Sequence, residues 1–168
     1  MTFMDLEEYI LQYSRRGEGQ EEEETAPILF ATIAGKAIAF SQGGVKEVAR
    51  CDSIIPIPGM PDYVLGLVNL RGEFEALLDF RPLVSMPRDP LPAVFEALLG
   101  VLGDVRAAIY IDAVRGLVDF PRSQIIPPPP DLGDRLKELI IGEIAYEDDK
   151  IPLLDFSKVV SVLVEKKR

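Results

Sequence analysis

From Ile28 onward, short apolar runs alternate with polar positions and are separated by glycines or polar pairs. Such runs predict β-strands joined by tight turns. Two pairs of runs flank a two-residue turn, at Ala34-Gly35 and Arg71-Gly72, and are predicted hairpins. The predicted strands are Ile28–Ile33, Lys36–Ser41, Val45–Cys51, Leu65–Leu70, Phe74–Asp79, Val94–Leu102, Val105–Asp112, Val118–Phe120, Gly142–Tyr146 and Ile151–Leu154, with an extended segment at Ile54–Pro58.

The run Val94–Leu102 has a composition that also suits a helix. The turn pair Gly103-Asp104 and the strand-like run Val105–Asp112 follow it directly. A run, a turn and a second run make a hairpin, so we interpret Val94–Leu102 as a strand.

Two other stretches follow the helical period. The first covers residues 4–16 and precedes two glycines and four glutamates, which predict a charged, extended linker; its apolar positions are Met4, Leu6, Tyr9, Ile10 and Tyr13. This short helix is either a frayed leader or a docking helix for the body of the protein or for a partner. The second helix begins at Phe156; its apolar positions are Phe156, Val159, Val160, Leu163 and Val164.

The sequence repeats itself. Leu65–Val84 aligns with Ile141–Val160, so that Gly66 meets Gly142 and both copies contain Leu-Leu-Asp-Phe. Upstream, Ile-Ile-Pro occurs at residues 54–56 and again at 125–127. The repeat predicts two similar β lobes, each ending in a helical turn, and strand lobes of about 60 residues close best as small barrels. Asp79 and Asp155 lie where a side chain would cap that turn, which is a structural role.

Charge and length limit the class of protein. The 168 residues suit one domain or two small lobes, and a net charge of −10 disfavours binding to nucleic acid or to an anionic membrane. Residues 1–26 hold eight acids and two bases, a net −6, which leaves −4 for the rest. We expect a cytoplasmic protein without membrane insertion, because a basic leader and a long apolar run are missing. The single cysteine, Cys51, is expected to be a small buried residue.

The residues that carry most enzyme chemistry are missing. The chain has no histidine, which removes histidine-based catalysis and imidazole metal sites, and it has no phosphate-binding glycine loop. Asp148-Asp149 reads as a solvated turn rather than a cation site. We therefore expect no enzyme activity, no metal and no cofactor.

Residues 66–81 read GLVNLRGEFEALLDFR. This segment resembles the signature of the CheW family of chemotaxis coupling proteins, a strand of the form G-x-x-N-L-R-G and a second strand ending Asp-apolar-Arg. Further elements resemble the family in the same order, namely residues 45–48, the Pro-bearing approach at 54–66, residues 108–114, and Gly142 with residues 153–155. The resemblance covers about residues 28–164.

The resemblance implies two intertwined five-stranded barrels of the SH3-like type over residues 28–168, preceded by the helix and acidic linker of residues 1–27. It implies a scaffold that binds the tip of a methyl-accepting chemoreceptor and the regulatory domain of a chemotaxis-type histidine kinase. The positions it places at partner contacts are Val45, Glu47, Asn69, Arg71 and Gly72.

Simpler roles are open for these residues. Arg71 and Glu47 can pair with each other, Asn69 can bond locally, and Gly72 can serve the geometry of the turn. The chain also departs from the family pattern at Gln42-Gly43-Gly44 and where Glu73 and Glu75 alternate with Phe74 and Ala76.

These departures favour, as an alternative, a divergent paralogue that binds only one partner or serves a gliding or twitching motility pathway. A third hypothesis is a β-barrel that binds a small molecule or acts as an enzyme.

Overall fold

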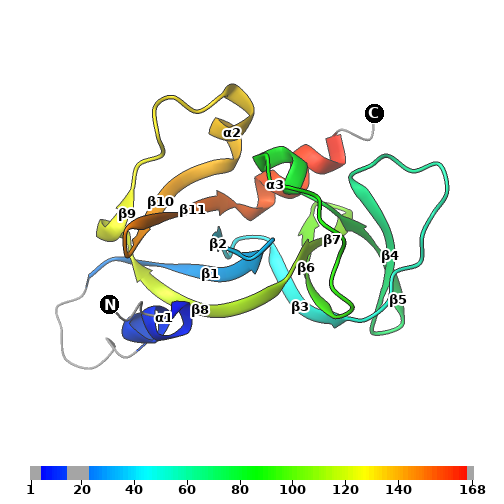
Figure 1. Cartoon of the computed structure of the whole chain (residues 1–168), viewed down its shortest axis with the longest axis horizontal. Helices are drawn as coiled ribbons and strands as arrows, with labels where there is room; N and C mark the ends of the chain where they lie inside the picture. The colour runs from blue at the N-terminus through cyan, green and yellow to red at the C-terminus, as the bar shows by residue number, and fades with distance from the viewer. Residues whose placement is uncertain (1–4, 15–22, 166–168) are drawn as a thin grey trace. The chain divides into compact units, whose positions relative to one another are not determined.

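A computed structural model describes residues 5–14 and 23–165. Their strands form two sheets, and the chain divides into two compact units. The first unit, or first lobe, takes residues 1–42 and 114–155, and the second lobe takes residues 43–113 and 156–168. Each lobe thus contains segments that are far apart in the sequence (Figure 1).

The sheet of the first lobe has the strand order β8-β1-β2-β11-β10-β9. Its hairpins β1–β2 and β10–β11 are antiparallel, and β2 and β11 lie side by side in parallel. The strands are β1 (Thr25–Ile33), β2 (Lys36–Ser41), β8 (Ala113–Pro121), β9 (Ile125–Ile126), β10 (Ile140–Tyr146) and β11 (Asp149–Asp155).

The sheet of the second lobe has the order β3-β6-β7-β5-β4, which repeats the plan of the first. Two antiparallel hairpins, β6–β7 and β4–β5, meet through a parallel pair, β5 and β7. The strands are β3 (Val45–Cys51), β4 (Val64–Leu70), β5 (Glu73–Leu78), β6 (Phe95–Leu102) and β7 (Val105–Ile111). All the predicted strands are confirmed, including residues 94–102, with bounds that shift by a few residues.

The repeat explains why each lobe is built from two separate stretches of the chain. In each half a hairpin is followed by a third strand that joins the other sheet: β3 follows β1–β2, and β8 follows β6–β7. The chain then returns to the far edge of the sheet it has joined. Ile55 pairs with Leu67 on β4, and Ile126 of β9 pairs with Glu143 on β10. Each sheet is thereby partly closed toward a barrel, which covers part of its exposed edges.

The repeated glycines mark this closure. Gly66 and Gly142 each lie at a β-bulge of the first strand of their hairpin. A Cβ at Gly66 would lie 2.4 Å from the carbonyl oxygen of Ile55, and one at Gly142 would lie 3.0 Å from that of Ile126. The returning segment therefore crosses Gly66 closely enough to exclude a side chain, and it crowds Gly142 less severely.

Both predicted helices are present. They are α1 (Leu6–Ser14) and α3 (Phe156–Glu165). Phe156 and Val160 of α3 cover Gly100 of β6, where a Cβ would lie 2.5 Å from the Phe156 ring. The sequence missed α2 (Asp134–Leu139), because only Leu139 of it is buried and a single buried residue sets no period. The 3-10 turns are η1 (Arg81–Val84) and η2 (Arg122–Gln124). Among the helices of the described chain, none is long and apolar enough to cross a membrane.

Candidate partner-binding site

The turn of the β4–β5 hairpin presents Arg71. Arg71 and Gly72 both have positive φ, 54° and 87°. This conformation matches the twist of the flanking strands, and glycine tolerates it best. The Oδ1 atom of Asn69 accepts a hydrogen bond of 2.9 Å from the backbone N–H of Gly72. Asn69 and Gly72 thus shape the turn.

Arg71 reaches from this turn to the opposite edge of the sheet. Its Nε atom lies 2.9 Å from Oε1 of Glu47 on β3, which is the pairing that the sequence allowed. The Arg71 side chain is 83% exposed and that of Glu47 is 25% exposed. An exposed pair adds little to stability, but it orients a guanidinium group that is otherwise largely exposed.

Four of the five candidate residues therefore gather at one place: Glu47, Asn69, Arg71 and Gly72. Val45 takes part in neither contact. It pairs with Gly100 and is separated from Glu47 by a β-bulge. Val45 is half-buried at the start of β3.

Beside the turn lies a row of exposed apolar residues that the sequence analysis did not assign to the site. Phe74 is 56% exposed and pairs with Asn69, and Val105 pairs with Leu102 on the neighbouring hairpin. Arg106, the residue after Val105, contacts Glu73 and Glu75 on either side of Phe74, so the beginnings of β5 and β7 lie near each other. We call Phe74, Val105 and Leu102 the apolar stripe; exposed apolar groups that gather next to a charged residue are typical of docking surfaces.

The glutamates on either side of Phe74 explain why its ring points outward. Glu73 and Glu75 alternate with Phe74 in the sequence, and the structure buries Glu75 while Phe74 is exposed. Arg106 of β7 makes this possible, because its Nε atom lies 2.8 Å from Oε1 of Glu75 and its Nη2 atom lies 3.1 Å from Oε2 of Glu73. Only the tertiary structure supplies this counter-charge.

We predict that Arg106→Ala lowers the free energy of unfolding by about 1–3 kcal/mol, because it leaves the carboxylate of Glu75 buried without a cation. Glu73→Ala is the matched control. It breaks an exposed contact of the same arginine and should change stability by less than about 0.5 kcal/mol. Urea unfolding of both variants measures the difference, and equal effects would contradict the role of the pair.

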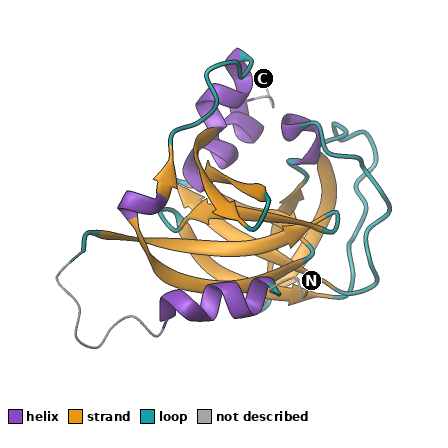
Figure 2. Cartoon of the chain, turned by 60° about the vertical axis from the view of Figure 1, so that its left-hand side comes forward, coloured by secondary structure: helices purple, strands orange, loops and turns teal. Residues whose placement is uncertain are grey.

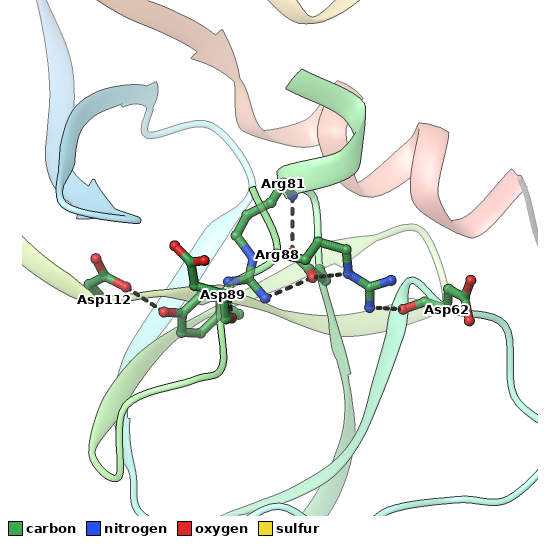
Figure 3. A network of polar contacts seen from close by, with 7 residues as sticks. Asp62, Arg81, Arg88, Asp89 and Asp112 are labelled. Carbon is green, nitrogen blue, oxygen red and sulfur yellow. Dashed lines mark hydrogen bonds and ion pairs between the residues drawn. The ribbon is translucent and has the colours of Figure 1, made fainter. Parts of the chain in front are cut away.

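At the end of β5, a network of polar contacts around the buried Asp79 fixes the chain that follows (Figure 3). Asp79 is fully buried and binds Arg81 through both carboxylate oxygens, at 2.9 and 3.0 Å. Arg88 contacts Oδ2 of Asp79 at 3.2 Å, and Nη1 of Arg81 donates to the carbonyl oxygen of Asp89. The network ties the loop of residues 85–94 to the end of β5.

Asp79 and Asp155 were expected to cap helical turns. Asp79 accepts the backbone N–H of Arg81 at 3.0 Å, while the residue that directly precedes η1 is Phe80, whose side chain makes no cap. Asp155 is the last residue of β11 and directly precedes α3. A capping bond from Asp155 stays a prediction.

The network also changes the acidity of its members. The guanidinium of Arg81 lies 4.9 Å from the centre of the Tyr110 ring, and the Tyr110 hydroxyl donates to Asp112. Burial, followed by the bond to Asp112, raises the pKa of Tyr110. Burial lowers the pKa of Arg81, but the bond to Asp79 and its charge outweigh this and raise it. Arg81 and Tyr110 therefore keep their protons, as a structural network requires.

No group of three or more His, Cys, Asp or Glu side chains within residues 5–14 and 23–165 is arranged to hold a metal ion. The candidate site offers a cation, a turn and an apolar stripe, which together suit the binding of a protein surface.

Comparison with known proteins gives consistent matches. A model of the CheW-like domain family matches residues 27–164. Protein FrzA of Myxococcus xanthus is 31% identical over 118 residues, which are 69% of this chain and 73% of FrzA. Chemotaxis protein CheW of Treponema pallidum is 26% identical over 122 residues, 70% of this chain and 72% of the relative.

A solved structure shares the fold. The crystal structure of the scaffolding protein TtCheW from Thermoanaerobacter tengcongensis superposes with a TM-score of 0.66 at 21% sequence identity. The match covers 80% of this chain and 92% of that chain. The predicted fold of two SH3-like β lobes with a C-terminal helix is thereby confirmed.

Proposed function

The chain belongs to the CheW-like domain family, and from this we propose that it is a non-catalytic adaptor that couples a chemoreceptor to a chemotaxis-type histidine kinase. The structural neighbour is named a scaffolding protein, which supports an adaptor over an enzyme. The partners that we propose are the tip of a methyl-accepting chemoreceptor and the regulatory domain of the kinase, in a cytoplasmic signalling array.

The observation that carries this proposal is the geometry at Arg71. A guanidinium held by Glu47 lies beside the exposed apolar stripe, on a turn that Asn69 and Gly72 shape. Arginine is enriched in binding hot spots, and aromatic residues such as Phe74 are enriched in protein interfaces. We propose that Arg71 and the stripe supply affinity, and that Glu47 fixes the direction of Arg71.

The adaptor would work without chemistry. Binding two proteins at once raises the concentration of one beside the other. A change in the receptor reaches the kinase only if binding of the receptor changes the affinity of the adaptor for the kinase. Binding of the kinase must then change the affinity of the adaptor for the receptor by the same factor.

A binding experiment with purified partner fragments tests the role of Arg71. We expect Arg71→Glu to weaken binding of the kinase regulatory domain or of the receptor fragment by about thirtyfold, as for loss of a hot-spot residue. Arg50→Glu is the matched control, because Arg50 is an exposed arginine on β3 and its replacement changes the charge equally. Binding is measured by calorimetry with each purified partner fragment.

If the Arg71→Glu chain keeps its unfolding midpoint and binds both partners like the Arg50→Glu chain, Arg71 has no part in docking. If only Phe74→Ser weakens binding, the apolar stripe carries the affinity alone. If neither Arg71→Glu nor Phe74→Ser weakens binding, this surface has no part in the proposed function.

A second candidate is a paralogue that binds one partner or serves a motility pathway. Its support is that FrzA, at 31% identity, is not named a chemotaxis protein, whereas the CheW of Treponema pallidum, at 26%, is. Glu73 and Glu75, which depart from the family pattern and contact Arg106, also support this candidate. Binding of one partner without formation of a ternary complex would favour this candidate.

A further inference from the structure

The first lobe has a seam that its strands do not close. β8 lies at one end of the sheet order, while β10, with the two-residue β9, lies at the other. Helix α1 contacts both sides. Ile10 packs on Gly116 of β8, and the Tyr9 hydroxyl donates 2.7 Å to the carbonyl oxygen of Ala145 on β10. Figure 2 shows α1 as the long helix at the bottom, lying against strands of this lobe.

The seam is shaped to receive a helix. A Cβ at Gly116 would lie 2.7 Å from Cγ2 of Ile10, so the glycine provides the space that the isoleucine fills. Leu6 and Ile10 are buried and belong to the same core cluster as Phe30, Val118 and Phe120. Because they are one helical turn apart, the two side chains enter the lobe from a single face of α1.

Aromatic and polar contacts fix the position of α1. The Tyr13 ring lies 4.5 Å from that of Phe120, and the Tyr13 hydroxyl donates 2.7 Å to Oε1 of Gln124 in η2. The ring of Tyr9 lies 5.1 Å from that of Tyr146. The seam therefore recognises aliphatic side chains at positions i and i+4 and aromatic side chains at i+3 and i+7.

In the second lobe, an ion pair takes the place that α1 has in the first lobe. Its seam lies between β3 and β4, the two ends of its sheet, and the ion pair of Arg71 with Glu47 spans it. Arg71 corresponds in the repeat to Glu147, and the two residues have nearly the same φ, 54° and 53°. The backbone is thus repeated, but the first lobe fills its seam with a helix while the second lobe spans it with an ion pair.

The helix also lies outside the segment that defines the family. The family match begins at residue 27, whereas α1 ends at Ser14. A helix of nine residues is marginally stable by itself, so its order depends on the seam. These are the properties of a ligand attached by a tether.

We propose that the seam between β8 and β10 is a binding site for an amphipathic helix, that α1 occupies it in cis, and that the first lobe thereby stays closed to the helices of other proteins. A competing helix must carry the pattern of α1, two aliphatic residues one turn apart flanked by aromatic ones. A tethered helix has a high effective concentration, so a competitor binds only when α1 leaves.

The test uses the full chain with α1 undocked by Ile10→Asp. The matched control is Leu11→Asp, which places the same charge on the neighbouring residue, 48% exposed in α1. The probe is a fluorescent peptide of residues 5–14 with Gln12→Lys joined to Glu8 by a lactam bridge, which holds the helix and lowers the cost of ordering it. Fluorescence anisotropy measures its affinity for each chain.

We expect the Ile10→Asp chain to bind the peptide at least about tenfold more tightly than the wild type and Leu11→Asp chains. Adding Gly116→Leu to Ile10→Asp should abolish this binding, because the new side chain occupies the space that Ile10 filled. If the folded Ile10→Asp chain does not bind the peptide, or binds it equally with Gly116→Leu, the seam is no helix-binding site. If Ile10→Asp unfolds the lobe, α1 is an integral part of the core and the proposal is wrong.

Discussion

Asp79→Ala should lower the free energy of unfolding by about 3–5 kcal/mol, as expected when one partner of a buried ion pair is removed. The variant would leave Arg81, which is 3% exposed, as a cation without a carboxylate, and would also free Arg88. Burial opposes a charge on Arg81, and Asp79 provides the hydrogen bonds and the negative charge that offset it. The effect should appear in urea unfolding as a lower midpoint.

The repeat supplies the control for this prediction. Asp155 corresponds to Asp79, but Ser157 stands where the first copy has Arg81. Ser157 instead donates a hydrogen bond to the carbonyl oxygen of Gly43. Asp155 is half-buried, whereas Asp79 is fully buried, so Asp155→Ala should cost about 1 kcal/mol, the usual value for the loss of a helix cap. Equal destabilisation by the two variants would show that the ion pair is not what makes Asp79 important.

Gly66→Ala is the other substitution with a large expected effect, a loss of about 2–5 kcal/mol in the free energy of unfolding. Gly66 has φ of +144°, which side chains avoid, and its Cβ would lie 2.4 Å from a backbone oxygen. A backbone carbonyl in a closed sheet cannot move aside as the end of a side chain can. The segment around Ile55 would have to leave β4, which opens the barrel of the second lobe.

Gly142→Ala is the comparison variant, because it crowds its neighbours without the strain of a positive φ. Gly142 takes the same place in the first lobe, but its φ lies outside the left-handed range, and the nearest atom is the Ile125 side chain at 2.7 Å. We expect a smaller loss than for Gly66→Ala, because that side chain can shift. Gly103→Ala, with open space around it, isolates the cost of a positive φ. A Gly66→Ala chain as stable as the Gly103→Ala chain would refute the argument.

The turn that carries three of the candidate residues could be predicted from the sequence because its parts are local. Asn69, Arg71 and Gly72 lie within four residues of each other in a hairpin turn, whose geometry depends on those residues alone. All five candidate residues were assigned to partner binding by resemblance, and the contact of Glu47 with Arg71 joins strands at opposite ends of the sheet order. The sequence analysis did not identify the apolar stripe. Alternation does not tell which face of a strand is exposed when a glutamate, here Glu75, is the buried residue.

By itself, the sequence determined the strands, their hairpins and the presence of two copies of one lobe, because periodicity and turn residues act over a few neighbours. The tertiary structure alone decided which long-range neighbours meet: Arg106 with Glu75, Asp79 with Arg88, and α1 with the seam of β8 and β10. These contacts depend on the register between strands that are distant in the chain. The free energy of burying a charge or a helix face can be assigned only once that register is known.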